Sequence, residues 1–299
     1  PRGKITLLHG PSSSGKSTIA LHASAEAQRQ GGVAIYFDFE GKLDLDYSAA
    51  LGVDIAAMGR PKPEEVSTIE GAFKAIEAAL RFFIDKHEGV PIVIVWDSLH
   101  SAVSGAESRT DWEEGGYPGE AKAYSRCLRK LTGIIGLSGV VLVFISQQRM
   151  DLGSPAKGAQ TIGVGKAPLH ASALCLVFSK PRATGKDGIL SGDSVTIRTE
   201  KNHLAPRRQK VDVLMSYGIG FEPASSLMEA GVLVGEFSQA PKKSGTGVSK
   251  GWYVSASEGA ESKRFQGAGG LRRMKDANPE RYEALREVVR KRMQATDEE

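Results

Sequence analysis

The feature that most constrains how this chain can fold is a glycine-rich segment close to its start. Residues 10–17 read GPSSSGKS and fit the pattern G-x-x-x-x-G-K-S. An apolar run of strand length, residues 5–9, comes before it, and residues 17–30 follow with helical spacing and end at a pair of glycines. A strand, a glycine loop and a helix in this order are the context in which the pattern binds phosphate. The sequence therefore predicts a nucleotide phosphate-binding loop.

The residue types in this loop suit a nucleotide with its metal ion. Glycines let backbone N–H groups turn toward an anion, and the start of the following helix adds the positive end of its dipole. Lys16 is expected to reach the β- and γ-phosphates, and Ser17 to hold Mg²⁺. A Ser/Gly-rich turn that binds nothing is the alternative. The loop residues expected to bind ATP are Gly10, Pro11, Ser12, Ser13, Ser14, Gly15, Lys16, Ser17 and Thr18.

Further apolar runs of strand length recur along the chain, with helical patterns between them. The runs are residues 33–37, 92–96, 140–145 and 174–178, and the helical patterns are about 17–29, 65–86 and 119–135. This alternation favours a mostly parallel, twisted sheet flanked by helices, which is the α/β fold class. After Phe178, the segment GKDGILSGD is typical of a hairpin tip, with SVTIRTE as a strand on one arm.

The length of 299 residues fits one large domain and one small domain. From about residue 221 the chain becomes polar and glycine-rich. It ends in a helical segment, ERYEALREVVRKRM, for which Asn278 and Pro279 supply a cap and a first turn. We therefore predict an ATPase core at residues 1–222 and a small, basic α+β domain at residues 223–299.

Charge is concentrated in the C-terminal part of the chain. Residues 242–292 hold thirteen Lys and Arg against six Asp and Glu, whereas the whole chain has a net charge of only +4. The excess favours an anionic partner, although a solvated basic face explains it equally well on charge alone.

Composition excludes membrane and disulfide-rich classes. The chain is 40% hydrophobic and 25% charged, as soluble globular proteins are. We find no apolar run of about 18 residues and expect no signal peptide. Cys127 and Cys175 lie far apart without metal-ligand spacing. We therefore expect core thiols in a reducing compartment, and a cytoplasmic protein.

Three polar residues follow predicted strands. Asp97 ends the run in PIVIVWDS and is expected to bind magnesium directly or through water, with a turn-capping aspartate as the alternative. Glu40 follows residues 33–37, where a carboxylate could accept a proton from water. Gln147 follows the run that ends at residue 145 and would lie beside the γ-phosphate. On spacing alone, an ordinary surface carboxylate and an ordinary polar strand end are equally good interpretations of Glu40 and Gln147.

The segments GPSSSGKST, YFDFEGKLDLDY, VIVWDSLHSAV and VFISQQRMDLG resemble the bacterial RecA recombinase family in order and spacing. The resemblance continues through TEKNHLAP and YGIGFEPASSLMEAGVL to WYVSASEG and the last helix, so that it covers nearly the whole chain. It implies a RecA-like P-loop ATPase core with a small C-terminal domain.

The resemblance also implies roles for single residues around the nucleotide. Glu40 corresponds to the acid that activates water, and Gln147 to the glutamine that senses the γ-phosphate and couples it to DNA binding. Asp44 and Tyr47 correspond to positions that contact adenine, with Tyr47 stacking on the base. From its chemistry alone, Tyr47 could equally be a half-buried aromatic residue that covers the sheet.

Two more positions relate to neighbouring subunits. Lys201 and His203 fall where the family has two lysines that reach the ATP of the next subunit. His203 is a departure, because a neutral imidazole supplies less positive charge at pH 7. The family's N-terminal helix and strand, which pack on the neighbouring subunit and help to build the filament, have no counterpart before the first predicted strand. We therefore expect either that the true N-terminus is longer than this sequence or that the protein assembles differently.

The family's two DNA-binding loops have counterparts at residues 104–120 and 148–167. Both are too long for simple connections. The first is acidic and the second has no aromatic residue, so an ordinary surface loop is the alternative for each. The candidate contacts to single-stranded DNA are Tyr117 by stacking, and Arg149, Lys157 and Lys166 through phosphates.

The resemblance implies a DNA-dependent ATPase that uses ATP and Mg²⁺, assembles into a filament on single-stranded DNA and promotes homologous pairing and strand exchange. The C-terminal domain is expected to bind double-stranded DNA through Arg264, Arg272 and Arg273. One alternative is a RecA-fold nucleotide-binding regulator or scaffold without strand exchange. A ring-shaped DNA motor is the other.

Overall fold

The computed structural model describes residues 1–62, 66–86, 89–109, 119–150, 160–162, 164–186, 189–204, 209–242, 248–259 and 262–296. The chain separates into two compact units, Pro1–Gly220 and Phe221–Glu299. Within the described ranges, none of the helices combines the length and the apolar character that crossing a membrane requires.

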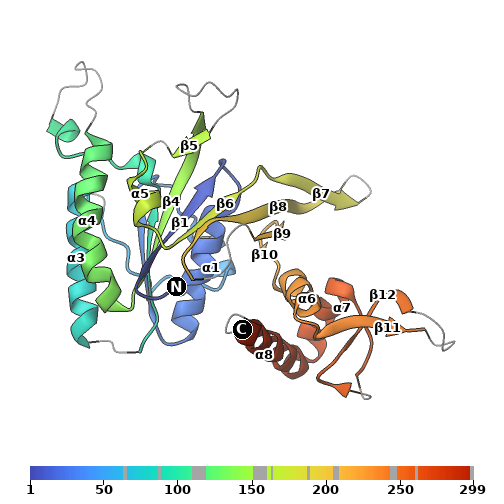
Figure 1. The fold of residues 1–299 in the computed structure, drawn as a ribbon. Coiled ribbons are helices and arrows are strands. Elements are labelled where there is room, and N and C mark those ends of the chain that lie inside the picture. Colours follow the sequence, from blue (N-terminus) through green and yellow to red (C-terminus); the bar gives the residue numbers. More distant parts are fainter. Residues whose placement is uncertain are drawn as a thin grey trace. The chain divides into compact units, whose positions relative to one another are not determined.

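The first unit is built on a ten-stranded sheet with parallel strands at its centre (Figure 1). The strand order is β10-β9-β8-β6-β1-β4-β3-β2, and the run from β6 to β2 is parallel throughout. The parallel strands are β1 (Lys4–Gly10), β2 (Val33–Asp38), β3 (Ile92–Asp97), β4 (Val141–Met150) and β6 (Leu174–Phe178). The predicted α/β fold with a mostly parallel sheet is confirmed.

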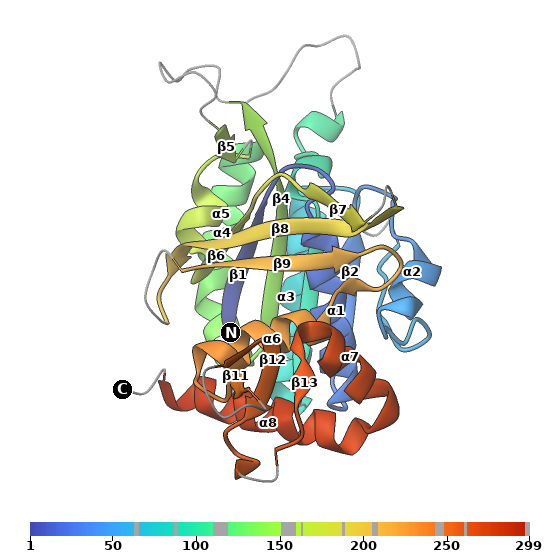
Figure 2. The same cartoon turned by 90° about the vertical axis from the view of Figure 1, so that its right-hand side faces the viewer.

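Helices cover both faces of this sheet, with α3 and α4 on one side and α1 on the other (Figures 1 and 2). They are α1 (Lys16–Arg29), α3 (Ile69–Lys86) and α4 (Glu120–Ser138). Side chains alternate along the strands accordingly. On β3, Ile94 and Trp96 belong to the core formed with α3 and α4, whereas Val93 and Val95 are buried on the opposite face.

Trp96 lies at the centre of an aromatic cluster in this core. The centroid of its ring is 4.8 Å from that of Phe39, 5.1 Å from that of Phe73 and 5.8 Å from that of Phe144. Its side chain is fully buried. Because Asp97 is the next residue, the cluster fixes the end of β3 from which that carboxylate projects.

Antiparallel strands extend the sheet beyond β6. β8 (Ile189–Asn202) pairs with β6, β7 (Arg182–Lys186) and β9 (Lys210–Ser216). The β7–β8 pair confirms the hairpin predicted after Phe178. The predicted strand at 140–145 was too short, because β4 continues to Met150 and pairs antiparallel with β5. The remaining elements of this region are α2 (Leu45–Ala50), η2 (Leu99–Ser101), η3 (Glu107–Arg109), β5 (Gln160–Ile162), α5 (Ala167–Ala171) and β10 (Gly220–Phe221).

The second unit packs three helices on a three-stranded antiparallel sheet. Its elements are α6 (Pro223–Leu233), β11 (Phe237–Pro241), β12 (Val248–Ser255), β13 (Phe265–Gln266), α7 (Gly267–Ala277) and α8 (Pro279–Thr296). Its core residues include Leu227, Phe237, Phe265, Leu271, Tyr282 and Leu285. Asn278 caps α8 as predicted, because its Oδ1 accepts the N–H of Arg281 at 3.1 Å.

Candidate nucleotide-binding site

The predicted phosphate-binding loop runs from the end of β1 to the first turn of α1. Gly15 is the N-cap of α1 and has φ 87° and ψ 13°, a left-handed conformation that glycine adopts without strain. At Gly10 a Cβ atom would lie 2.7 Å from the carbonyl oxygen of Phe178, so β1 can approach β6 this closely only with glycine there. Both glycines of the motif are therefore required by the path of the backbone.

Lys16 lies over this loop and is only 5% exposed. Its Nζ donates to the carbonyl oxygen of Pro11 at 2.5 Å and to Ser14 Oγ at 3.4 Å. Burial lowers the pKa of Lys16 to about 8, although the charges of Asp97 and Glu40 act in the opposite direction. Since these hydrogen-bond partners are neutral, a phosphate in the loop would provide the charge-assisted bonds that a buried ammonium group favours.

The two residues predicted to hold magnesium are in contact. Ser17 Oγ donates to Asp97 Oδ2 at 2.6 Å, and the hydroxyl of Tyr36 donates to the same oxygen at 2.7 Å. Burial raises the pKa of Asp97, and these two hydrogen bonds oppose that rise. Burial and the charge of Asp97 also raise the pKa of Tyr36 far above its ordinary value, which keeps the phenol a donor.

The nucleotide and its metal ion fit this arrangement. In the described part of the chain, no group of three or more His, Cys, Asp and Glu side chains could hold a metal ion. A magnesium ion would therefore depend on phosphate oxygens together with Ser17 and Asp97, which is the usual way in which Mg²⁺ is bound with a nucleotide. The Ser17 hydroxyl can donate its proton to Asp97 while its lone pairs face the cation.

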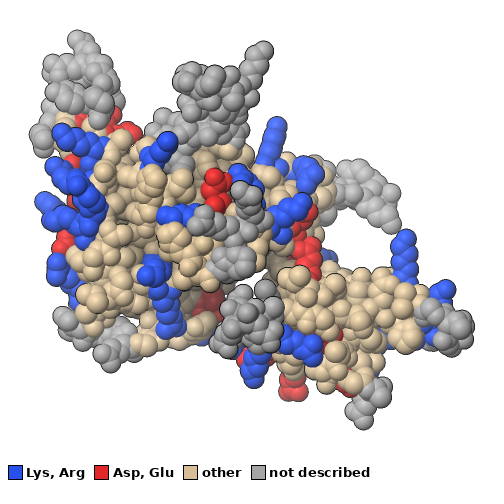
Figure 3. All heavy atoms as spheres, in the orientation of Figure 1, with Lys and Arg blue, Asp and Glu red and all other residues tan. Residues whose placement is uncertain are grey.

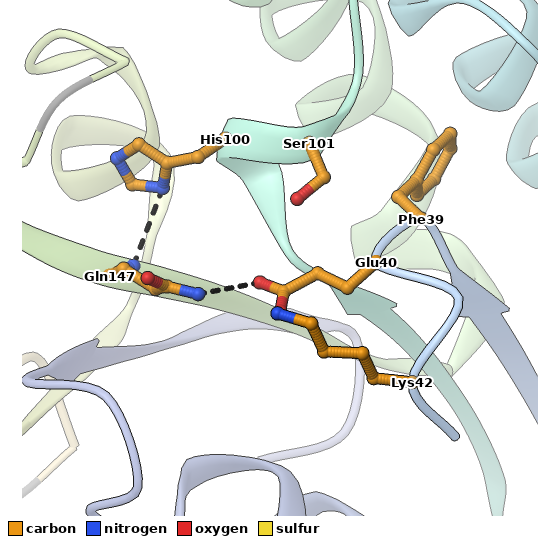
Figure 4. Close-up of a pocket in the computed structure, with 6 residues that line it drawn as sticks. All are labelled: Phe39, Glu40, Lys42, His100, Ser101 and Gln147. Atoms are coloured by element: carbon orange, nitrogen blue, oxygen red, sulfur yellow. Dashed lines mark hydrogen bonds and ion pairs between the residues drawn. The ribbon is translucent and has the colours of Figure 1, made fainter.

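Glu40 and Gln147 line a cavity of about 290 Å³ at the carboxyl edge of the sheet (Figure 4). Gln147 Nε2 donates to Glu40 Oε1 at 2.6 Å, and Ser98 Oγ donates to the same oxygen at 2.7 Å. Lys42 Nζ lies 3.0 Å from Glu40 Oε2. The fold thus brings together two polar residues that the sequence placed only at the ends of separate strands.

These donors set the basicity of Glu40. Its burial raises the pKa, but the hydrogen bonds from Ser98, Lys42 and Gln147 outweigh that effect and leave the pKa of Glu40 below its ordinary value. The carboxylate is consequently an anion at neutral pH. It becomes a stronger base wherever one of these donors turns to another acceptor.

The position of Gln147 is fixed by β1 on one side and by His100 on the other. On one side it pairs with Gly10 of β1. On the other side, the register of β3 with β4 ends at Trp96 and Phe144. Beyond that point His100 Nδ1 accepts the backbone N–H of Gln147 at 3.3 Å (Figure 4). The imidazole of His100 in η2 therefore accepts the backbone N–H of Gln147 at a point where β3 no longer pairs with β4.

A second cavity, of about 340 Å³, follows the loop on its other side. Besides the loop it is lined by Tyr47 and the turn at residues 215–218. The hydroxyls of Tyr47 and Thr18 lie 3.3 Å apart, so the predicted base-stacking residue adjoins the phosphate loop. Asp44 does not line this cavity. It is the N-cap of α2, and its Oδ1 accepts the N–H of Tyr47 at 2.9 Å, so its contact with adenine remains a prediction.

Lys201 and His203 lie apart from these cavities within one chain. Lys201 pairs with Cys175 near the beginning of β6, whereas the phosphate loop follows the end of the neighbouring parallel strand β1. Lys201 Nζ donates to the carbonyl oxygens of Leu169 and His170 at 3.0 and 2.7 Å. His203 is exposed. Their predicted contact with ATP therefore requires a second copy of the chain.

The predicted DNA contacts are described only in part. Tyr117 and Lys157, and the side chain of Arg149, lie outside the described residues. Lys166 is exposed at the N-cap of α5. Helix α4, which follows the first predicted loop, exposes several cations (Figure 3). They are Lys122, Arg126, Arg129 and Lys130, of which Arg126 pairs with Glu70 at 3.0 Å.

Several residues of the site were missed by sequence reasoning. Ser98 and His100 directly follow the predicted magnesium residue, and Lys42 follows the predicted base, but serine, histidine and lysine at a strand end carry no distinct signal. Tyr36 was missed because its approach to Asp97 depends on strand register. On adjacent parallel strands Tyr36 pairs with Val95 and Asp38 with Asp97, so Tyr36 and Asp97 fall on the same face of the sheet.

Comparisons with known proteins agree with this geometry. The family model described as RecA N-terminal domain matches residues 1–222. The chain is 36% identical to Protein RecA of Treponema denticola over 254 residues, which are 85% of this chain and 57% of that protein. It is 33% identical to Protein RecA of Desulforapulum autotrophicum over 235 residues, 79% of this chain and 65% of the relative.

A third relative is matched along almost the whole chain. Protein RecA of Chlorobium chlorochromatii is 33% identical over 294 residues, which are 98% of this chain and 77% of that protein. The chain thus spans between about half and three quarters of the length of these relatives. With the family model, the phosphate loop and the residues gathered at the carboxyl edge of the sheet all in agreement, the chain belongs to the RecA family.

Proposed function

We propose that this chain is an ATP-dependent DNA recombinase, which assembles on single-stranded DNA, hydrolyses ATP and promotes homologous pairing and strand exchange. The observation that carries the proposal is the hydrogen bond of 2.6 Å between Gln147 and Glu40. It joins the carboxylate that would act on water to the strand that leads into the second predicted DNA loop. Membership of the family supports the same function.

In the proposed reaction, each side chain has a distinct task. Lys16 and the loop amides would hold the phosphates, and Ser17 and Asp97 would hold a magnesium ion, which would supply positive charge against the charge developing on the phosphates. Glu40 accepts a proton from the attacking water. Gln147 donates either to Glu40 or to the γ-phosphate. When it turns to the phosphate, Glu40 loses a donor and becomes a stronger base.

The same reorientation of Gln147 would also affect the contacts with DNA. Gln147 lies in β4 directly before the three residues that pair with β5 at the base of the second predicted loop. We propose that Arg149, Lys157 and Lys166 of that loop contact phosphates of single-stranded DNA, and that Tyr117 of the first loop stacks on bases. Binding of ATP then favours the arrangement that holds DNA, and hydrolysis releases it.

Electron microscopy with single-stranded DNA tests the proposal, combined with ATPase assays on the same protein. We expect filaments in the presence of a non-hydrolysable ATP analogue, and ATP hydrolysis that rises when DNA is added. Lys16→Ala should abolish both, because phosphate charge is left uncompensated. Rings that unwind duplex DNA would instead indicate a motor, and nucleotide binding without any response to DNA would indicate a scaffold.

Lys201→Ala should remove most of the stimulation by DNA. If Lys201 reaches the γ-phosphate of the neighbouring subunit, each site is complete only in the assembly. The rate should then fall by roughly 10²–10³-fold, as when one electrostatic donor to a developing charge is lost. Steady-state ATPase measured against protein concentration, with and without DNA, checks this, and His203→Lys tests whether a second cation raises the rate. Full stimulation in Lys201→Ala would exclude the shared site.

The C-terminal unit should bind double-stranded DNA weakly and with a steep dependence on salt. Two of the cations predicted for this role have internal partners. Arg272 Nε lies 2.5 Å from Oε1 of the buried Glu222, and Arg264 donates to the carbonyl oxygen of Pro241. We therefore expect the exposed Arg273 to contribute more.

The two adjacent arginines provide a matched pair for this test. Arg273→Ala should weaken binding to duplex DNA and reduce the slope of log affinity against log salt by about 1. Arg272→Ala should mainly lower the thermal stability of the unit, because the buried Glu222 carboxylate loses its cation and keeps the hydrogen bond from Ser225. Fluorescence anisotropy and thermal unfolding separate the effects, and affinity that ignores salt would indicate an ordinary solvated face.

A further inference from the structure

We propose that the hydroxyl of Tyr36 is a positioning group for the Asp97 carboxylate and thereby sets the affinity of the site for the magnesium ion of the nucleotide. This inference rests on the proposed nucleotide-binding function. It concerns a residue to which neither the motif nor the family resemblance assigned a role.

Two hydrogen-bond donors converge on one carboxylate oxygen of Asp97. Tyr36 reaches Asp97 Oδ2 from β2 at 2.7 Å, and Ser17 reaches the same atom from the first turn of α1 at 2.6 Å. Neither of these bonds goes to Oδ1. A carboxylate held at one oxygen from two directions has little rotational freedom, which leaves its other oxygen in a fixed position for a metal ion or its bound water.

The surroundings of Tyr36 strengthen its hydrogen bond to Asp97. Tyr36 is only 2% exposed, so water does not compete for its hydroxyl. A phenol that donates to a carboxylate forms a charge-assisted hydrogen bond, which is stronger than one between neutral groups. In the first unit, β2 and β3 are hydrogen-bonded neighbours, so the spacing between Tyr36 and Asp97 is set by the sheet itself.

A bound magnesium ion would affect the two donors, Ser17 and Tyr36, differently. Ser17 is a predicted ligand, so its hydroxyl has to serve the cation and Asp97 together. Tyr36 lies in β2 and is not a predicted ligand of the ion, and its hydroxyl donates to Asp97 and also lies beside the Ser17 hydroxyl. It therefore holds the carboxylate whether or not the ion is bound, and outer-shell partners of this kind typically change metal affinity or activity by about 10–100-fold.

A purely structural role for Tyr36 makes a different prediction. Its ring is buried beside α1, and packing of that ring would be preserved in phenylalanine. Tyr36→Phe removes only the oxygen that contacts Asp97. A matched control is Tyr124→Phe, since Tyr124 is also fully buried in the first unit and donates at 2.5 Å to the carbonyl oxygen of Leu99, two residues after Asp97, rather than to the Asp97 carboxylate.

The test is the binding of a fluorescent, non-hydrolysable ATP analogue to the full chain during a titration with Mg²⁺. We expect the half-saturating Mg²⁺ concentration to rise about tenfold or more in Tyr36→Phe, with unchanged affinity for the analogue in EDTA. In Tyr124→Phe it should equal that of the wild type. Circular dichroism verifies that each variant is folded.

Two results would overturn the inference, and they are distinguishable. If the wild type binds the analogue in a Mg²⁺-dependent way and Tyr36→Phe shows the same dependence, the role of Tyr36 is wrong and the proposed function stands. If Tyr36→Phe and Tyr124→Phe shift the dependence equally, the effect is one of packing alone. A wild-type chain that binds no analogue at all overturns both this inference and the proposed function.

Discussion

Glu40→Gln should slow ATP hydrolysis by about 10²–10⁴-fold while leaving ATP binding intact. The amide keeps the size and shape of the side chain, and its oxygen can still accept the bonds that Glu40 Oε1 accepts from Gln147 and Ser98. It cannot accept a proton from water. Single-turnover hydrolysis and equilibrium binding of an ATP analogue measure the two properties separately.

The matched control is Glu77→Gln, the same chemical change on α3, where Glu77 pairs with Arg81 at 2.8 Å. It should leave both hydrolysis and binding unchanged. One further effect is specific to position 40: the neutral amide ends the ion pair with Lys42. If Glu40→Gln abolishes analogue binding together with hydrolysis, Glu40 holds the site in shape and is not the proton acceptor.

Trp96→Ala should lower the free energy of unfolding of the first unit by about 3–5 kcal/mol. The side chain is fully buried, and its ring contacts Phe39, Phe73 and Phe144. Truncation leaves a cavity in the centre of the core directly before Asp97. Chemical denaturation, followed at a signal of the first unit, gives the change, and Mg²⁺-dependent nucleotide binding should weaken with it.

Two other substitutions sharpen this result. Leu137→Ala, at a side chain that is 79% exposed, should change the free energy of unfolding by less than about 0.5 kcal/mol. Trp96→Phe should cost much less than Trp96→Ala, because Trp96 Nε1 is buried without a hydrogen-bond partner in the described part of the chain and its loss removes that penalty. Equal losses from Trp96→Ala and Leu137→Ala would contradict the central place given to the tryptophan.

The parallel core was predictable because its signals are local. Each central strand is an apolar run that ends at a polar residue, and each helix between them repeats apolar positions at helical spacing. β4 was predicted too short, since Gln148, Arg149 and Met150 are polar or isolated residues that become a strand only by pairing with β5. In the second unit, α6 and α7 were not anticipated, and for α7 the reason is that Gly267, Gly269 and Gly270 are poor helix formers.

The contacts of the candidate site also differ in whether local sequence patterns predict them. The contact of Ser17 with Asp97 follows from a motif, and the approach of Glu40 to Gln147 follows from the rule that parallel strands end at one edge of the sheet. The hydrogen bonds from Tyr36 and His100 depend on the register between strands and on the course of a short 3₁₀ helix. Register emerges from packing of the whole sheet, so no pattern within one segment specifies it.

The register of β1 with β4 affects how far the amino-acid sequence of the rest of this protein can diverge. Gly10 and Gln147 are direct partners in the sheet, so the phosphate loop and the strand leading toward the second predicted DNA loop are separated by one interstrand distance, about 4.8 Å. In the proposed recombinase, communication between ATP and DNA then depends on the side chain of Gln147 and on its place opposite Gly10 in the sheet. The helices, the outer strands and most of the core can diverge without affecting it.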